Sequence, residues 1–222
     1  MKKLLLLSVL FWSMTSFIQQ EKPKKIIFFG DSITQAGVQP NGYITKLQEM
    51  IDKNGEKANY ELVGAGIGGN KVYDLYLRLE DDVLSKKPDL VVIYVGVNDV
   101  WHKATSGTGT DPDKFIRFYQ ALINKIQANG AKLILCTPAT IGEKTDFSNQ
   151  QDGDMNQYSN FIRNLATKNN IPLCDLRKEF LGHNLNNNPE NKDKGILTTD
   201  RVHLNELGNQ FVADKLFPLI TK

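Results

Sequence analysis

Four polar side chains of this sequence have the types and spacing that nucleophilic catalysis needs. Ser32 follows a Gly-Asp pair, Asn98 stands inside the run 96–99, and Asp200 precedes His203 by three residues. A serine hydroxyl attacks a carbonyl only when a neighbouring base takes its proton, and an imidazole oriented by a carboxylate is a common base. The residue types therefore indicate acyl transfer, with Ser32 as nucleophile, His203 as base and Asp200 as the partner of His203.

These side chains are far apart in the sequence, so a fold must bring them together. Short apolar segments that end in turn residues alternate with segments of helical period. Strands are expected at 25–29, 60–63, 89–95, 132–136 and 171–174, and helices at 42–53, 72–84, 115–126, 155–167 and 204–219. Near-continuous apolar strands are typical of a parallel sheet that is covered on both faces.

The alternation predicts an α/β protein, a three-layer α/β/α sandwich with a mostly parallel five-stranded sheet, in a single domain over residues 21–222. In such folds ligands bind outside the carboxyl ends of the strands. Ser32 and Asn98 each follow a predicted strand closely, so they are expected at that edge. The polar stretches 138–153 and 182–196 are expected to be long surface loops.

Four short motifs resemble those of a known enzyme family, the GDSL or SGNH serine hydrolases. Gly30-Asp31-Ser32 is similar to the first block of that family, and Gly69 stands where its second-block glycine falls. Gly96-Val97-Asn98-Asp99 matches the G-x-N-D block, and Asp200-Arg201-Val202-His203 matches the D-x-x-H block. All four occur in family order, which is far more specific than one motif alone. The resemblance implies a flavodoxin-like α/β/α fold and the hydrolysis of esters.

The same residues suggest how the charge that develops in such a reaction is stabilised. We expect an oxyanion hole made by the backbone N–H groups of Ser32 and Gly69 and by the side-chain amide of Asn98. Losing one such donor typically costs about 3–4 kcal/mol of transition-state stabilisation. Glycine suits position 69 because a backbone N–H aimed at a ligand needs close approach without a Cβ.

Each of these residues also has a structural interpretation. Ser32 could cap a helix that follows the first strand, Asp200 could be a loop carboxylate, and His203 could begin a helix. Asp31 and Asp99 are expected to be structural residues that tie down their turns. Each alternative is common for a single residue, but the four motifs together favour catalysis.

The glycine-rich turn after the second predicted strand has a competing interpretation. Gly64, Gly66 and Gly69 satisfy the G-x-G-x-x-G dinucleotide fingerprint. That fingerprint needs an acidic residue about 20 positions later, at the end of the next strand. Here Asp89 begins the next predicted strand, and the run 96–98 at its end comes too late and has no carboxylate. No cysteine and histidine spacing resembles a zinc site. We therefore expect no cofactor and no metal; the alternative is a flavodoxin-like cofactor carrier.

Two aromatic residues and two cysteines carry weaker signals. Trp101 and His102 follow the Asn98 motif and are candidate substrate-binding residues at the mouth of the site, where an indole can stack on a sugar ring. The alternative is a partly buried aromatic at the rim. Cys136 and Cys174 lie near the ends of predicted strands, where free cysteine is commonly a small core residue. The sequence leaves open whether they form a disulfide.

The composition of the 222-residue chain is that of an ordinary globular domain. A formal net charge of +2 and 23% charged residues give no reason to expect a nucleic-acid partner. Residues 1–20 have the layout of a secretory signal peptide, with Lys2-Lys3 before an apolar run shorter than the roughly 20 residues of a membrane-spanning helix. The mature chain is thus expected to be periplasmic or extracellular without stable membrane insertion; an uncleaved anchor is the alternative.

These observations together predict an exported serine esterase that works through a covalent acyl-enzyme. The loops are polar and no amphipathic lid is visible, which favours a short acyl group such as acetyl on a sugar or polysaccharide. The expected partner is therefore a small-molecule or glycan ester. The alternatives are a lysophospholipase or lipase-type acylhydrolase, and a non-catalytic carbohydrate-binding protein on the same fold. No oligomeric state is predicted.

Overall fold

The strands of the central sheet all run parallel. The computed structural model describes residues 22–221, so the predicted signal peptide lies outside the described residues. The strands are β1 (Lys24–Gly30), β2 (Tyr60–Gly66), β3 (Leu90–Tyr94), β4 (Lys132–Cys136) and β5 (Leu173–Cys174). Their spatial order is β2-β1-β3-β4-β5, which is the order of flavodoxin-like doubly wound folds. The predicted five-stranded parallel sheet is confirmed.

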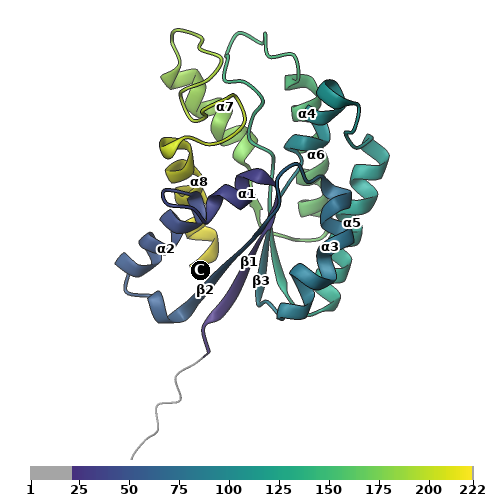
Figure 1. Ribbon diagram of the computed structural model, residues 1–222, viewed down its shortest axis with the longest axis vertical. Coiled ribbons are helices and arrows are strands. Elements are labelled where there is room, and N and C mark those ends of the chain that lie inside the picture. The colour runs from purple at the N-terminus through teal and green to yellow at the C-terminus, as the bar shows by residue number, and fades with distance from the viewer. Residues whose placement is uncertain (1–21, 222) are drawn as a thin grey trace, which may run out of the picture.

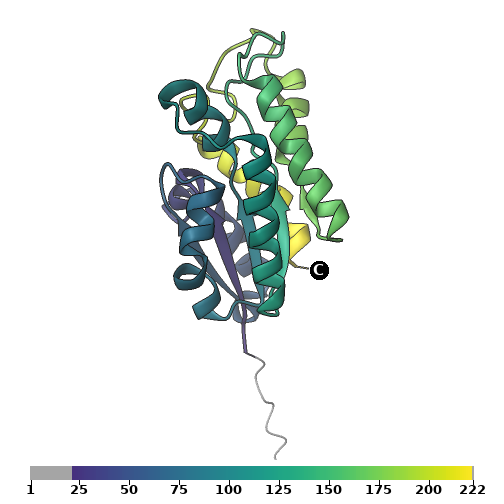
Figure 2. The same ribbon diagram turned by 90° about the vertical axis from the view of Figure 1, so that its right-hand side faces the viewer.

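Helices cover both faces of this sheet, as Figure 1 and Figure 2 show. They are α1 (Ser32–Gly37), α2 (Tyr43–Lys53), α3 (Val72–Asp82), α4 (Val97–Ser106), α5 (Pro112–Ala128), α6 (Asp152–Lys168), α7 (Leu176–Asn187) and α8 (Glu206–Ile220), with short 3-10 turns at Lys57–Asn59 and Leu84–Lys86. Helix α2 packs on α8 at one face, and α3 packs on α5 at the other. Among residues 22–221, no helix is long and apolar enough to cross a membrane.

The apolar strands owe their composition to this double cover. Residues 26–29 of β1 have no exposed surface, and every residue of β3 is buried. A strand with helices on both faces cannot alternate apolar and polar side chains, because neither side meets water. The predicted strands were recognisable in the sequence for this reason.

Three helices were not expected from the sequence. The predicted loop 182–196 is wrong over residues 182–187, because α7 continues to Asn187. Its buried apolar side chains, Leu176 and Phe180, lie near its start, and the later turns are rich in asparagine and lack an apolar stripe. Helix α1 is too short for periodicity to reveal, and α4 begins within the run 96–99, which was analysed only as a motif.

The parallel register aligns the carboxyl ends of the strands. Gly30 is the register partner of both Gly66 and Tyr94, so the segments that leave β1, β2 and β3 begin side by side. Farther along the same edge, Cys136 and Cys174 are register partners; both are buried and free of a disulfide. The segments that carry Ser32, Gly69 and Asn98 therefore start from one edge.

Candidate active site

Ser32 lies at the first turn after β1. The side chain of Asp31 accepts a hydrogen bond from the backbone N–H of Ile33 at 3.0 Å, so Asp31 is the N-cap of α1 and Ser32 is its first helical residue. The capping role that Ser32 could have had thus belongs to its neighbour. Gly30 is required at this turn because a Cβ there would collide with the Thr34 side chain and with the carbonyl oxygen of Tyr94.

The imidazole of His203 connects the serine to a carboxylate. Ser32 Oγ lies 2.9 Å from His203 Nε2, and His203 Nδ1 lies 2.7 Å from Asp200 Oδ2. The other oxygen of Asp200 accepts the backbone N–H groups of Val202 and His203 at 3.1 and 2.8 Å. Burial opposes ionisation of this carboxyl, but the hydrogen bonds from His203 and Val202 outweigh it and lower the pKa of Asp200. The ionised carboxylate is thus held against one imidazole nitrogen.

A buried glutamate holds the segment that carries Asp200 and His203. Glu143 is 1% exposed, and its two carboxylate oxygens accept the backbone N–H groups of Ile196 at 2.8 Å and Leu197 at 2.6 Å. Beyond them, Thr198 and Leu204 pair as an antiparallel bridge, which closes the turn around the two catalytic candidates. Sequence reasoning missed Glu143, because one carboxylate in a polar stretch carries no signal for burial.

Two of the three residues expected to form the oxyanion hole, Gly69 and Asn98, lie on neighbouring segments. Gly69 has φ +76°, and a Cβ built on it would come no closer than 3.7 Å to the His102 ring. The positive φ is a conformation that favours glycine, and this requirement adds to the close approach of a ligand expected from the sequence. Asn98 is 2% exposed near the start of α4, and its Nδ2 donates to the carbonyl oxygen of Asn70 at 3.1 Å.

Asp31 and Asp99 are buried carboxyls that bind backbone groups. Asp99 has no exposed surface and accepts the backbone N–H of Val72 at 3.2 Å, which ties the start of α3 to α4. Burial raises the pKa of Asp31 to about 7 and that of Asp99 to about 6. Because both carboxyls hold turns next to the candidate catalytic residues, their ionisation affects the stability of the site.

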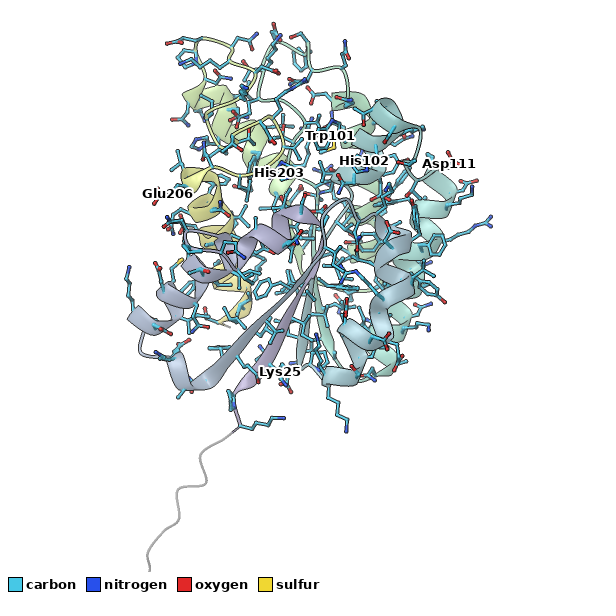
Figure 3. All side chains as sticks on the ribbon, viewed as in Figure 1. Lys25, Trp101, His102, Asp111, His203 and Glu206 are labelled. Atoms are coloured by element: carbon cyan, nitrogen blue, oxygen red, sulfur yellow. The ribbon has the colours of Figure 1, made fainter. Side chains whose placement is uncertain are left out.

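Trp101 and His102 lie beside the histidine and the glycine of the site. The ring centroids of Trp101 and His203 are 6.3 Å apart with the planes tilted by 69°, and His102 lies next to Gly69. Figure 3 shows Trp101, His102 and His203 near one another, with Lys25 at the other end of the molecule. Burial, followed by the charge of Lys71, lowers the pKa of His102. Both rings therefore lie against residues of the candidate site.

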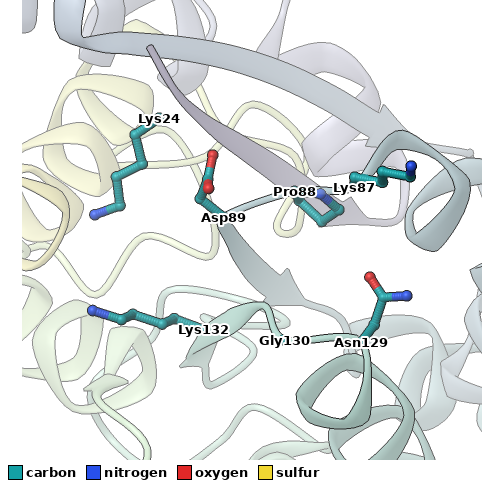
Figure 4. Close-up of a pocket in the computed structure, with 7 residues that line it drawn as sticks. All are labelled: Lys24, Lys87, Pro88, Asp89, Asn129, Gly130 and Lys132. Carbon is teal, nitrogen blue, oxygen red and sulfur yellow. The ribbon is translucent and has the colours of Figure 1, made fainter. Parts of the chain in front are cut away.

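The site is open to solvent. The side chain of His203 is 36% exposed and that of Asp200 is 49% exposed. By contrast, a cavity of about 660 Å³ opens at the amino-terminal ends of β1, β3 and β4, where Lys24, Lys87 and Lys132 line it (Figure 4). That cavity lies at the opposite edge of the sheet from Ser32, and the residues that line it include no serine, cysteine or histidine.

Two glycines of the glycine-rich turn are required by packing within the fold. A Cβ on Gly66 would collide with the backbone of Gln35 and Asp31, and one on Gly64 would collide with Val38. These glycines therefore allow α1 and the residue after it to pack on the end of β2. Among residues 22–221, no group of three or more histidine, cysteine, aspartate or glutamate side chains is placed to hold a metal ion.

The fold and the site define a class: flavodoxin-like α/β proteins with a serine–histidine–aspartate set at the carboxyl edge of the sheet. The chain belongs to the GDSL-like lipase/acylhydrolase family, whose model matches residues 28–211. Among its relatives is an acetylxylan esterase of Geobacillus stearothermophilus, 28% identical over 86% of this chain and 90% of that protein. An isoamyl acetate-hydrolyzing esterase 1 homolog of Bos taurus is 24% identical over 89% of this chain and 82% of that protein.

A solved structure is more similar still. The crystal structure of the acetyl xylan esterase AlAXEase has 68% sequence identity and a TM-score of 0.87, and the match covers 88% of this chain and 99% of that one. Family membership and these similarities make the chain a carboxylic ester hydrolase. The interpretation as a non-catalytic carbohydrate-binding protein is therefore set aside.

Proposed function

We propose that this chain is an exported esterase that removes acetyl groups from acetylated xylan or a related polysaccharide. The observation that carries the proposal is the hydrogen-bonded series Ser32–His203–Asp200, with distances of 2.9 and 2.7 Å. Both distances are short enough for a proton to pass from the hydroxyl to the imidazole while the carboxylate holds the ring. The catalytic residues are thus Ser32, Asp200 and His203.

The reaction proceeds in two halves. His203 takes the proton of Ser32 as Oγ attacks the ester carbonyl, and it then gives that proton to the leaving alkoxide of the sugar. This leaves an acetyl group on Ser32 Oγ. Water, deprotonated by His203, attacks the acetyl-enzyme; as the bond to Ser32 Oγ breaks, His203 returns the proton to that oxygen, which releases acetate and restores the free serine. Asp200 stabilises the imidazolium that forms in each half and keeps Nε2 directed at the serine.

Three donors bind the oxyanion of each tetrahedral intermediate. They are the backbone N–H groups of Ser32 and Gly69 and one N–H of the Asn98 side chain. Asn98 Nδ2 carries two hydrogens, and the hydrogen bond to Asn70 uses one of them, which leaves the other for the oxyanion. A donor fixed before the reaction stabilises the developing charge without reorganisation at that moment.

The surroundings of the triad support a polymeric substrate with a small acyl group. His203 and Asp200 are open to solvent, so a glycan chain can lie across the site. Trp101 stands against His203, and His203 must face the leaving oxygen, so the indole borders the sugar side of the ester. The acetyl xylan esterases to which the chain is similar support the same substrate class.

Acetate release from acetylated xylan, together with a series of p-nitrophenyl esters, tests the proposal. We expect acetate release, a preference for acetyl over butyryl and longer chains, and no activity in Ser32→Ala. A preference for long acyl chains, with the Ser32 dependence intact, would support a lipase-type acylhydrolase and contradict the proposed substrate. Activity that survives Ser32→Ala would contradict the mechanism.

Export is part of the proposal because a polysaccharide of this kind is met outside the cell. The sequence of residues 1–20, with a basic start, an apolar stretch and a polar exit, supports it. The mass of the mature chain, recovered from culture medium or an envelope fraction, tests this step. Cleavage near residue 20 is expected, and full-length chain confined to the cytoplasm would contradict it.

A further inference from the structure

The loop that carries Gly69 is held by side chains outside the proposed catalytic set. This oxyanion loop, residues 67–71, connects the end of β2 to the start of α3. The backbone N–H of Ile67 donates to the carbonyl oxygen of Gly30 at 3.2 Å, and that of Gly68 donates to the Gln35 side chain at 2.8 Å. The first half of the loop is therefore attached to the segment around Ser32.

Arg78 attaches the second half of the loop to the sheet. Its Nε donates to the side-chain oxygen of Asn70 at 2.7 Å, and its Nη2 donates to the carbonyl oxygens of Gly30 at 2.8 Å and Ala65 at 3.0 Å. Its Nη1 pairs with Asp82 at 2.7 Å. One guanidinium, 14% exposed, thus joins the end of β1, the end of β2 and the loop.

The planar guanidinium is fixed as well as bonded. It lies over the ring of Phe29, with 4.5 Å between Cζ and the ring centroid, and Phe29 itself has no exposed surface. The rigid fork of an arginine offers donors in several directions within one plane, which the flexible ammonium of lysine cannot reproduce. The side chain of Asn70 is consequently bonded to a group that has little freedom to move.

Asn70 also holds the amide of Asn98, through its backbone. Asn98 Nδ2 donates to the carbonyl oxygen of Asn70 at 3.1 Å, while Arg78 binds the side-chain oxygen of the same residue. The side chain of Asn70 therefore determines where its carbonyl lies. That carbonyl in turn determines the direction of the free N–H of Asn98, since the two hydrogens of an amide are fixed relative to each other.

We propose that Asn70 and Arg78 are positioning residues that aim the Asn98 amide at the oxyanion. The series Arg78–Asn70–Asn98 connects the buried end of β1 to the amide without touching substrate. The inference rests on the proposed function and deepens it, because it accounts for the placement of a donor in a site that is open to water. A displaced donor weakens transition-state binding more than substrate binding, so the effect falls on kcat.

The test is a double-mutant cycle between Asn70→Ala and Asn98→Ala, measured with p-nitrophenyl acetate. The alanine at 70 keeps the backbone carbonyl but loses the bond to Arg78. We expect Asn70→Ala to lower kcat by about 10- to 100-fold with KM changed by less than about 3-fold, as misplacement of a catalytic donor does. In the Asn98→Ala background, the same substitution should lower kcat by less than about 3-fold, because its target is already absent.

Arg78→Met should repeat the effect of Asn70→Ala. The matched control is Asp82→Asn, which weakens the outward ion pair of Arg78 but leaves its bonds to the loop; kcat should stay within about 2-fold of the unsubstituted chain. Thermal unfolding accompanies each variant. If Arg78→Met does not fold, the cycle at Asn70, which is partly exposed, still decides the question.

Two results would overturn the inference. One is an Asn70→Ala variant with the kcat of the unsubstituted chain. The other is an equal loss of kcat in both backgrounds, because independent losses mean that Asn70 does not act through Asn98. Neither result affects the proposed function, which fails only if the unsubstituted chain lacks esterase activity or if Ser32→Ala retains it.

Discussion

Ser32 Oγ lies 2.9 Å from His203 Nε2, although 171 positions separate the two residues in the chain. The contact is possible because β1 ends at the edge of the sheet where the segment before α8 also arrives. Asp31 fixes the start of α1 on one side, and Glu143 fixes the backbone at Ile196 and Leu197 on the other. The proposed catalytic contact is therefore made by two segments that are each held by a buried carboxyl.

Removal of the Ser32 hydroxyl tests the proposed role of Ser32 as the nucleophile. Ser32→Ala should lower kcat for p-nitrophenyl acetate by at least about 10⁴-fold, because no other group at the site can form the acyl-enzyme. The melting temperature should change little, since Ser32 is not the cap of its helix. Ser85→Ala, a substitution of an exposed serine in the turn at 84–86, serves as the control and should retain full activity.

Replacement of Asp200 should lower kcat less than replacement of a fully buried triad aspartate does. In a buried triad, replacing the aspartate by asparagine lowers kcat by about 10⁴-fold, because the imidazole takes the wrong tautomer. The side chain of Asp200 is 49% exposed, so water can hydrogen-bond to Nδ1 in its place. We expect Asp200→Asn to lower kcat by about 10²- to 10³-fold. A loss of kcat as large as that of Ser32→Ala would show that water does not replace the carboxylate as the hydrogen-bond partner of His203 Nδ1.

The buried carboxyl of Asp31 predicts how stability depends on pH. Its pKa in the folded chain is raised to about 7, above the value in an unfolded chain, so the folded state holds the proton more tightly. The contribution of the Asp31 carboxyl to the free energy of unfolding is therefore fully present at low pH, and it is lost as the pH rises from about 4 to about 7. Asparagine also caps helices well.

Asp31→Asn should consequently remove the cost of ionising a buried carboxyl. We expect the variant to be more stable than the unsubstituted chain by about 4 kcal/mol at pH 8, and equal to it near pH 4. Urea unfolding at the two pH values measures this difference. A variant that is less stable at pH 8 would mean that the ionised carboxylate makes bonds worth more than its burial costs.

Glu143 offers a prediction about the loop that carries the base. Glu143→Ala leaves two backbone N–H groups without acceptors, that of Leu197 buried and that of Ile196 partly buried. A buried group of this kind costs about 1–3 kcal/mol. The melting temperature should fall by several degrees, and kcat should fall as His203 gains freedom. Glu190→Ala is a suitable control, since this nearby glutamate is exposed. An unchanged kcat in a folded Glu143→Ala chain would show that Glu143 does not position His203.

The sequence was sufficient for the sheet and for the residues that surround the serine. Strands buried on both faces have a continuous apolar composition, and the motifs around Ser32, Asn98 and His203 stand directly beside the expected elements. The sequence was insufficient to predict hydrogen bonds in which a side chain binds backbone groups far away along the chain. The bonds of Arg78 to Gly30 and of Glu143 to Leu197 follow from the folded arrangement, and neither residue belongs to a recognisable local pattern.

Substitution of Trp101 tests whether its indole contacts the sugar from which the acetyl group is removed. Its indole forms a T-shaped pair with the ring of His203, with 69° between the planes, and the proposed mechanism places it beside the leaving group of the ester. Trp101→Ala should lower kcat/KM for acetylated xylo-oligosaccharides by about 10-fold, because it removes the aromatic surface on which a sugar ring packs. The same variant should hydrolyse p-nitrophenyl acetate within about 3-fold of the unsubstituted rate, and Trp101→Phe should recover part of the loss. Equal losses on both substrates would instead mean that the indole supports the His203 ring, since that role does not depend on the alcohol that leaves.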